Sequence, residues 1–192
     1  MKFTNTPLYF SLDSAIIYSK TKEKYCMTEQ QPLKISLSQF PSLRVACYTA
    51  KHDVDPEVEA WAIMGTWAAE RIRMGELDPA AMRCFGYFVT PESPDAPADT
   101  YTVMISVPDH VQASDVIEIR QIRSFSCLTA QCAFKDEDLQ RCRALLRGFA
   151  VQKGVDTAFV YPLEEQIALP GEDPYFSVIL PVIPSGTSLF LS

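Results

Sequence analysis

The sequence predicts an α+β fold in which the order strand, helix, strand, turn, strand occurs twice. Two segments, beginning near residues 55 and 136, carry a helix start signal followed by apolar residues at helical spacing. Strand-like runs with one mostly apolar face surround each of them, which is typical of helices packed on antiparallel sheet. The two halves are expected at about 42–108 and 117–182, within one domain of residues 31–184.

The two ends of the chain differ from this pattern. Residues 1–30 have patchy hydrophobicity without a clear period and are expected to form a poorly ordered extension. Met27 opens a polar stretch that looks like an ordinary protein start, so residues 1–26 are interpreted as this extension or as translation from an upstream start codon. The competing interpretation is an extra strand at residues 8–12. Residues 185–192 are expected to form a tail.

The first half opens with the β-rich run SLRVACYTA at 42–50. Asp55 is a residue type that caps helices and Pro56 suits the first helical position, so a helix is expected to begin here and to stop at Gly75. Two strands should follow at 82–90 and 100–108, separated by the turn formers PESPDAPAD. The predicted packing stripe of the helix consists of Val58, Trp61, Ala62, Gly65, Ala68, Ala69 and Ile72.

The second half repeats this order. Residues 117–134 are long enough for two short strands or one bent strand, and a helix should start at KDEDLQ with Asp136 as its cap. Strands are expected at 158–169 and 175–182 around the turn PGEDP. The predicted stripe of the second helix is Leu139, Cys142, Leu145, Leu146 and Phe149, with Gly154 after its end.

The charge of the chain limits its partners. The 192 residues carry a net charge of −7, so nonspecific nucleic-acid binding and attraction to an anionic membrane surface are not expected. The same charge attracts cations, including organic ones. The sequence has no run of 18 apolar residues and no signal-peptide pattern, which favours a cytoplasmic protein.

No metal or cofactor is expected. The six cysteines form no CxxC pair, and His52 and His110 lie in polar, loop-like segments away from them. We interpret the cysteines as small buried residues in a reducing compartment. The sequence contains no nucleophile elbow, P-loop or dinucleotide-binding motif. These motifs therefore do not decide whether the protein is an enzyme.

Four segments in their order and spacing carry a family resemblance. They are PSLRVACYTA, EAWAIMGTWAAE, GYFVTPESP and FVYPLEEQIALPGEDPYFSVILPV. Together, over roughly residues 33–182, the sequence resembles the GyrI-like effector-binding family, which includes gyrase-inhibitor proteins and the ligand-sensing domains of multidrug-responsive transcription regulators. The resemblance implies a duplicated βαββ fold whose curved sheet and two helices form a central ligand cleft.

The resemblance also implies a site. In the family, a Glu on the penultimate strand lies among aromatic residues and meets the charge of an apolar cation, and this Glu falls on Glu164 here. The aromatic residue two positions later in the family is Gln166 in this chain, which implies a different ligand. The internal repeat places Phe88 at the equivalent position of the first half, whereas its neighbour Tyr87 should point to the opposite face. Trp61 is interpreted as a core ring or, alternatively, as a ligand contact.

Strand alternation makes the neighbouring Glu165 a competitor for this role. Glu165 shares a face with the apolar residues of 161–169, whereas Glu164 and Gln166 share the more polar face. If the apolar face packs on the helices, Glu164 lines the cleft. Glu165 then needs a partner, such as an arginine of the second helix, or a β-bulge that turns it out. We expect Glu164 to mark the site and keep Glu165 as the alternative.

Three functions follow, in order of preference. The first is a stand-alone binder of small, apolar, cationic or aromatic ligands. The second is a hydrolase of electrophilic small molecules in which Glu164 activates water. The third is a protein-interaction module, such as a partner of gyrase, and the chain could form a homodimer or bind a protein partner.

Overall fold

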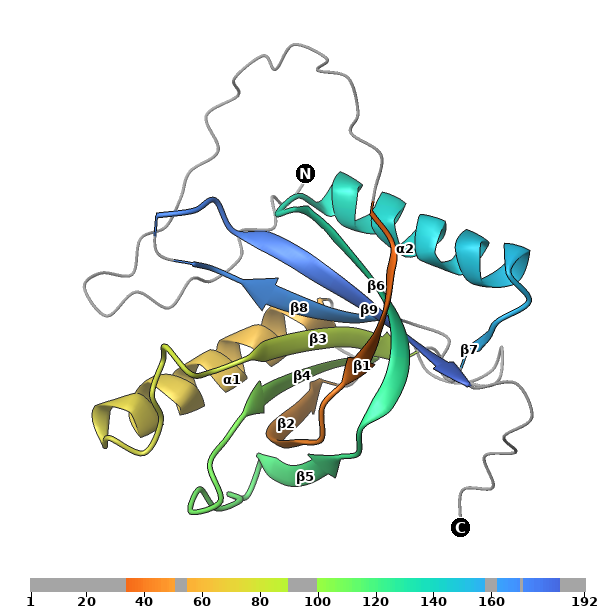
Figure 1. The fold of residues 1–192 in the computed structure, drawn as a ribbon. Coiled ribbons are helices and arrows are strands. Elements are labelled where there is room, and N and C mark those ends of the chain that lie inside the picture. Colours follow the sequence, from red (N-terminus) through yellow and green to blue (C-terminus); the bar gives the residue numbers. More distant parts are fainter. Residues whose placement is uncertain (1–33, 51–54, 90–99, 158–161, 170, 184–192) are drawn as a thin grey trace, which may run out of the picture.

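The computed structural model describes residues 34–50, 55–89, 100–157, 162–169 and 171–183. They form two helices and a curled antiparallel sheet of eight strands in the order β1-β6-β9-β8-β3-β4-β2-β5, and a short β7 pairs with β9 (Figure 1). The predicted α+β class is therefore confirmed. The expectations for residues 1–30 and 185–192 lie outside the described residues. Within the described chain, no helix is both long and apolar enough to cross a membrane.

The predicted repeat is visible in the sheet. The first unit consists of β2 (Leu43–Ala50), α1 (Pro56–Arg73), β3 (Cys84–Val89) and β4 (Thr100–Ser106). The second consists of β6 (Phe125–Ala133), α2 (Asp136–Gln152), β8 (Leu163–Ile167) and β9 (Tyr175–Ile183). Strands β3 and β8 pair at the centre, where the two units meet. Of the two interpretations of 117–134, the structure has two strands, with β5 (Glu118–Ile122) preceding β6.

The strand that precedes each unit pairs with an edge strand of the other unit. Strand β1 (Ser36–Phe40), which precedes the first unit, pairs with β6, and β5 pairs with β2. Strand β1 was not predicted, because the run SLSQF is exposed except at its last residue and has no apolar face. The two-residue β7 (Asp156–Thr157) is too short to leave a pattern.

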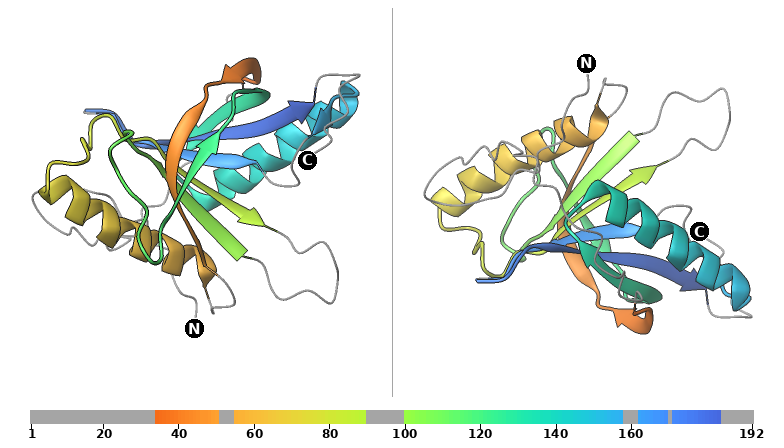
Figure 2. Two further views of the ribbon diagram at one scale, coloured as in Figure 1. Left: turned by 90° about the horizontal axis from the view of Figure 1, so that it is seen from below. Right: turned by 90° about the horizontal axis from the view of Figure 1, so that it is seen from above.

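Both helices cover the same face of the sheet. Helix α1 packs on β2 and β4, and α2 packs on β6 and β9 (Figure 2). Two separate apolar clusters lie under the helices, whereas a third, which includes Phe40, Phe85 and Ile179, fills the opposite, inner side of the curl. The central strands are consequently buried on both faces.

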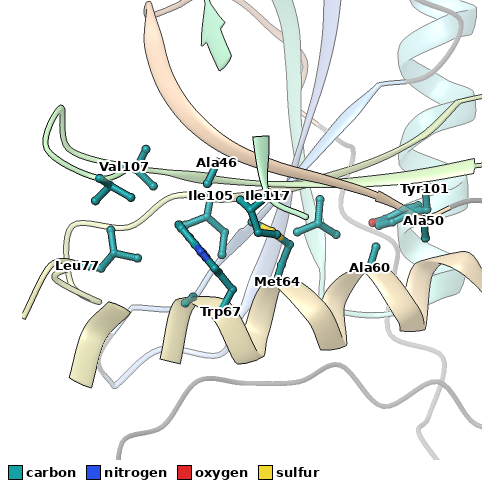
Figure 3. Packing of buried hydrophobic residues seen from close by; sticks show 13 residues of the cluster. Ala46, Ala50, Ala60, Met64, Trp67, Leu77, Tyr101, Ile105, Val107 and Ile117 are labelled. Carbon is teal, nitrogen blue, oxygen red and sulfur yellow. The ribbon is translucent and has the colours of Figure 1, made fainter. Parts of the chain in front are cut away.

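Helix α1 begins and ends as predicted, but its packing stripe is rotated. Asp55 accepts a hydrogen bond from the Val58 amide, and Gly75 adopts a φ of +75° just after the end of the helix. Val58, in contrast, is 50% exposed. Small residues occur all round this helix, so two overlapping faces could pack on the sheet. The face that carries the bulky Met64 and Trp67 is the buried one (Figure 3). The buried residues are Ala60, Met64, Gly65, Trp67 and Ala68.

Helix α2 differs from prediction at its cap and on its buried face. Lys135 occupies the N-cap position without a side-chain cap, and Asp136 is the first helical residue, so the assignment of Asp136 as the cap was wrong. Leu145 is 42% exposed, while Arg143 is buried in the predicted apolar stripe. A buried arginine needs a buried partner, and this partner defines the candidate site.

Candidate functional site

Glu164 lies on β8 with only 3% of its surface exposed. It is aligned with Gly86 of β3 and Val178 of β9, and Val178 belongs to the cluster under α2. Cross-strand partners share a face of the sheet, so Glu164 points to the helix-covered side. The expectation that the apolar face of this strand, which carries Glu165, packs on the helices was therefore wrong. There its carboxylate forms an ion pair with the guanidinium of Arg143.

Arg143 reaches Glu164 from α2 and lies over an aromatic ring. Its guanidinium carbon is 5.7 Å from the centroid of the Phe88 ring, and the residue is 8% exposed. The Nε of Arg143 is buried and has no hydrogen-bond partner among the described residues. Burial of such a donor without a partner costs about 1–3 kcal/mol.

Tyr101 forms part of the buried end of the site. It is 1% exposed and makes an edge-on contact with Phe88, with ring centroids 4.7 Å apart. The end of its ring lies over Gly86, where an added Cβ would approach the Tyr101 hydroxyl oxygen to 2.0 Å. The absence of a side chain at Gly86, which is aligned with Glu164, therefore leaves room for the Tyr101 ring.

Helix α1 contributes Glu57 and Trp61, both half-buried. They are four residues apart and therefore lie on one face of the helix. The indole N–H of Trp61 is buried without a hydrogen-bond partner in the described chain, and it lies near the Tyr101 hydroxyl. The site thus has a buried floor of Glu164, Arg143 and Tyr101 and a partly exposed rim of Glu57, Trp61 and Phe88.

Burial dominates the electrostatics of the two acids. It raises the pKa of Glu164 to about 7, although Arg143 acts in the opposite direction. It raises the pKa of Glu57 to about 7 as well, again against Arg143, and the neighbouring Asp55 and Asp136 raise it further. Burial and the two glutamates also raise the pKa of Tyr101, which keeps its phenol protonated. One arginine thus faces two carboxylates, and the site is short of positive charge.

Glu165 belongs to the other side of the sheet. Its carboxylate accepts hydrogen bonds from Arg83 Nε at 2.6 Å and Nη2 at 3.0 Å, and the Arg83 guanidinium lies over the rings of Phe40 and Phe85. Glu165 has a partner as expected, but this partner is Arg83 and not an arginine of the second helix, because Arg143 of that helix pairs with Glu164. No bulge turns Glu165 out, since β8 pairs continuously with β9.

The predicted site residues are thus divided between two faces. Glu164, Phe88 and Trp61 come together, whereas Tyr87 packs with the inner cluster on the side of Glu165. Gln166 is half-buried and lies on the same face of β8 as Glu164, opposite Cys84 and Phe176. Four residues of the site were not predicted from the sequence, namely Glu57, Gly86, Tyr101 and Arg143. Of these, Arg143 could have been found, because an arginine on the apolar face of a helix indicates a buried charge that needs a partner.

A cavity of about 330 Å³ lies elsewhere on the molecule. It opens on β2 and β5, and β2 is three strand positions from β8, which corresponds to about 14 Å. The cavity is therefore separate from the Glu164 site. Its lining consists of Cys47, Tyr48, Thr49, Val116, Glu118 and Arg120. Five cysteines fall in the described chain and all are free thiols; this part of the chain has no cluster of metal-binding side chains.

Comparison with known proteins identifies the fold. No family model and no curated protein matches the sequence. Among solved structures, the C-terminal domain of EcmrR superimposes with a TM-score of 0.61 at 12% identity, covering 79% of this chain and 98% of that domain. In a complex of EcmrR with DNA, the TM-score is again 0.61 at 13% identity, and this chain covers 57% of the EcmrR chain while 78% of its own length is matched.

A structure described as a hydrolase from Listeria innocua matches with a TM-score of 0.53 at 15% identity, covering 78% of this chain and 92% of the other. Identities this low establish the fold alone. The chain shares the fold of these proteins, which is the fold that the sequence resemblance to the GyrI-like family implied.

Proposed function

We propose that this protein binds apolar, cationic small molecules at the site of Glu57, Trp61, Phe88, Tyr101, Arg143 and Glu164. The observation that carries the proposal is a buried pair of Glu164 and Arg143 next to the aromatic residues Phe88 and Tyr101, with the second acid Glu57 close enough to raise the pKa of Glu164. A ring face attracts a cation by about 0.5–2 kcal/mol, and a carboxylate in a desolvated site attracts it more strongly than in water.

The balance of charge supports a cation over an anion. Glu57 and Glu164 face the single Arg143, and Asp55 and Asp136 lie close enough to affect the pKa of Glu57. An anionic ligand would add a like charge to this set, which is unfavourable. The overall charge of −7 acts in the same direction by attracting cations to the protein.

The test uses two probes of the same shape and opposite charge, tetraphenylphosphonium and tetraphenylborate. Titration calorimetry on the full chain should show binding of the cation at least about tenfold tighter than that of the anion, which corresponds to about 1.4 kcal/mol. Glu164→Gln should lower the affinity for the cation about tenfold, because Arg143 then competes for the remaining carboxylate. Equal affinity for both probes, or binding of neither, would contradict the proposal.

A hydrolase is the second candidate, because an acid with a pKa of about 7 suits a general base near neutral pH. The structure described as a hydrolase shares the fold. Incubation with a panel of esters, lactones and epoxides distinguishes the two functions. Consumption by the wild type but not by Glu164→Gln would establish an enzyme, whereas cation binding without turnover supports the binder.

A further inference from the structure

The two carboxylates of the site differ in their pairing. Glu164 is held by Arg143 in an ion pair whose side chains are 4% and 10% exposed. Glu57 forms no salt bridge in the part of the chain that the structure describes, and Arg143 influences it only through longer-range attraction. Among the described residues, the positive charge of Arg143 is therefore already paired with Glu164.

Glu57 also has the more accessible position. It lies in the first turn of α1 and is half-buried, whereas Glu164 on β8 is 3% exposed. One turn further along α1, the half-buried Trp61 lies on the same helical face. A ligand approaching from solvent meets this carboxylate and this ring before it meets the Arg143–Glu164 pair.

The site contains polar groups that the described chain leaves without partners. The Nε of Arg143 makes no hydrogen bond to the described chain although the side chain is nine-tenths buried, and the buried Trp61 indole N–H has only the nearby Tyr101 hydroxyl, without good hydrogen-bond geometry. Buried donors are normally satisfied, and exceptions concentrate at functional positions. These two donors flank the acids from α2 and α1, so the feature is more than a group of surface carboxylates.

Burial of Glu57, which has no salt-bridge partner among the described residues, is costly for the charged form; Asp55 and Asp136 add to this cost and Arg143 offsets part of it. A ligand cation would relieve both contributions at once. The same cation placed against Glu164 would have to displace Arg143, which has no second ion-pair partner among the described residues.

We infer that Glu57 is the carboxylate that meets the positive charge of the ligand, with Trp61 and Phe88 as its aromatic walls, while Arg143 serves as the internal counter-ion of Glu164. This inference rests on the proposed function. It assigns the ligand as an apolar monocation, because Glu57 is the one carboxylate of the site that has no salt bridge within the described residues.

Two variants separate the roles of the acids, again with tetraphenylphosphonium as the probe and the full chain in calorimetry. Glu57→Gln should lower the affinity at least tenfold. The double variant Arg143→Met with Glu164→Gln removes the internal pair and replaces it by uncharged side chains of similar size, and its affinity should fall clearly less than that of Glu57→Gln. Glu70→Gln, an exposed acid on the same helix, is the matched control and should bind like the wild type.

The outcomes distinguish the inference from the function on which it rests. If the double variant loses binding and Glu57→Gln keeps it, Glu164 is the ligand's counter-ion: the inference falls and the proposed function stands. Loss of tenfold or more in both variants would mean that the ligand needs both acids and would also overturn the inference. If the wild type does not prefer the phosphonium over the borate, the proposed function falls together with it. Circular dichroism of each variant excludes unfolding as the cause.

Discussion

Glu164 and Glu165 are neighbours on β8, yet each is held by a different arginine on a different face of the sheet. Arg143 of α2 pairs with Glu164 on the helix side, and Arg83, just before β3, pairs with Glu165 on the inner side. Both acids are buried, at 3% and 8% exposure. A strand with an acid buried on each face must be covered on both sides, and the pairing of β8 with β3 and β9 at the centre of the sheet provides this position.

The inner pair should support stability without affecting ligand binding. We expect Arg83→Met to lower the free energy of unfolding by about 1–3 kcal/mol, because it leaves the Glu165 carboxylate buried without its two charge-assisted hydrogen bonds. Urea unfolding measures this change. Affinity for tetraphenylphosphonium should stay at the wild-type value, since Arg83 lies on the other face of the sheet from Glu164.

The control for this variant is Arg120→Met. Arg120 forms an ion pair with Glu118 whose side chains are 53% and 65% exposed. Exposed pairs contribute about 0–1 kcal/mol, so this loss should be clearly smaller than that of Arg83→Met. Equal losses in the two variants would show that burial of the Arg83–Glu165 pair has no energetic weight.

Gly86 should not tolerate a methyl group. A Cβ there would lie 2.0 Å from the Tyr101 hydroxyl oxygen and 2.7 Å from the ring carbon that bears it, and Tyr101 is too buried to move aside. We expect Gly86→Ala to cost about 1–3 kcal/mol of stability through overpacking, and to weaken cation binding because Tyr101 is displaced. Thermal unfolding and calorimetry measure the two effects.

Gly148→Ala is the matched control for this substitution. Gly148 lies in α2, and nothing comes within 4 Å of an added Cβ. Alanine at an exposed helical position is favoured over glycine by about 0.5–1 kcal/mol, so the same chemical change should stabilise the protein here. A stabilised Gly86→Ala variant would contradict the packing of Tyr101 described above.

The two tryptophans of α1 should separate stability from binding. Trp67 is 8% exposed and packs within the cluster under α1, with Arg71 5.7 Å from its ring centroid. We expect Trp67→Ala to cost about 3–5 kcal/mol. Trp61→Ala should cost distinctly less stability, because this ring is half-buried, but should abolish most of the cation binding. If Trp61→Ala instead lost more stability than Trp67→Ala in unfolding experiments, Trp61 would be a core residue and not a ligand contact.

Cation affinity should depend on pH near neutrality. Glu57 and Glu164 both have pKa values raised to about 7, so both carboxylates become charged as the pH rises from 6 to 8. Binding of tetraphenylphosphonium should strengthen over this interval, since the probe itself does not titrate. Calorimetry at pH 6, 7 and 8 tests this, and Glu57→Gln should show a weaker dependence.

The same shifts have a consequence for stability of opposite sign. A carboxyl group whose pKa is higher in the folded protein holds its proton better there, so its stabilising contribution is complete below the ordinary value of 4.5 and is lost as the pH rises to about 7. Relative to Glu57→Gln, the wild type should therefore become less stable between pH 5 and 7 and then level off. A difference between the two that does not change with pH would contradict the raised pKa of Glu57.

Local signals were sufficient for the elements of the fold. The cap at Asp55 and the glycine after α1 fixed that helix within the chain, and the repeated order of strands and helices predicted the α+β class. Helical rotation was less certain, because the many small residues of α1 fit two stripes. The contact of Trp67 with strands distant in sequence selects one of them.

The strand β8 shows where sequence reasoning stopped. Alternation correctly separated Glu164 from Glu165, because backbone geometry alone places consecutive side chains on opposite faces. Which face the helices cover, and which arginine reaches which acid, depends on residues 21 and 82 positions away in the chain. The sequence by itself therefore determined the elements and the two faces of β8. Only the tertiary structure decided that Arg143 pairs with Glu164 and that Glu57 of the other unit is close enough for Arg143 to affect its pKa. The physical reason is that long-range ion pairs form only after the sheet has brought the two units together.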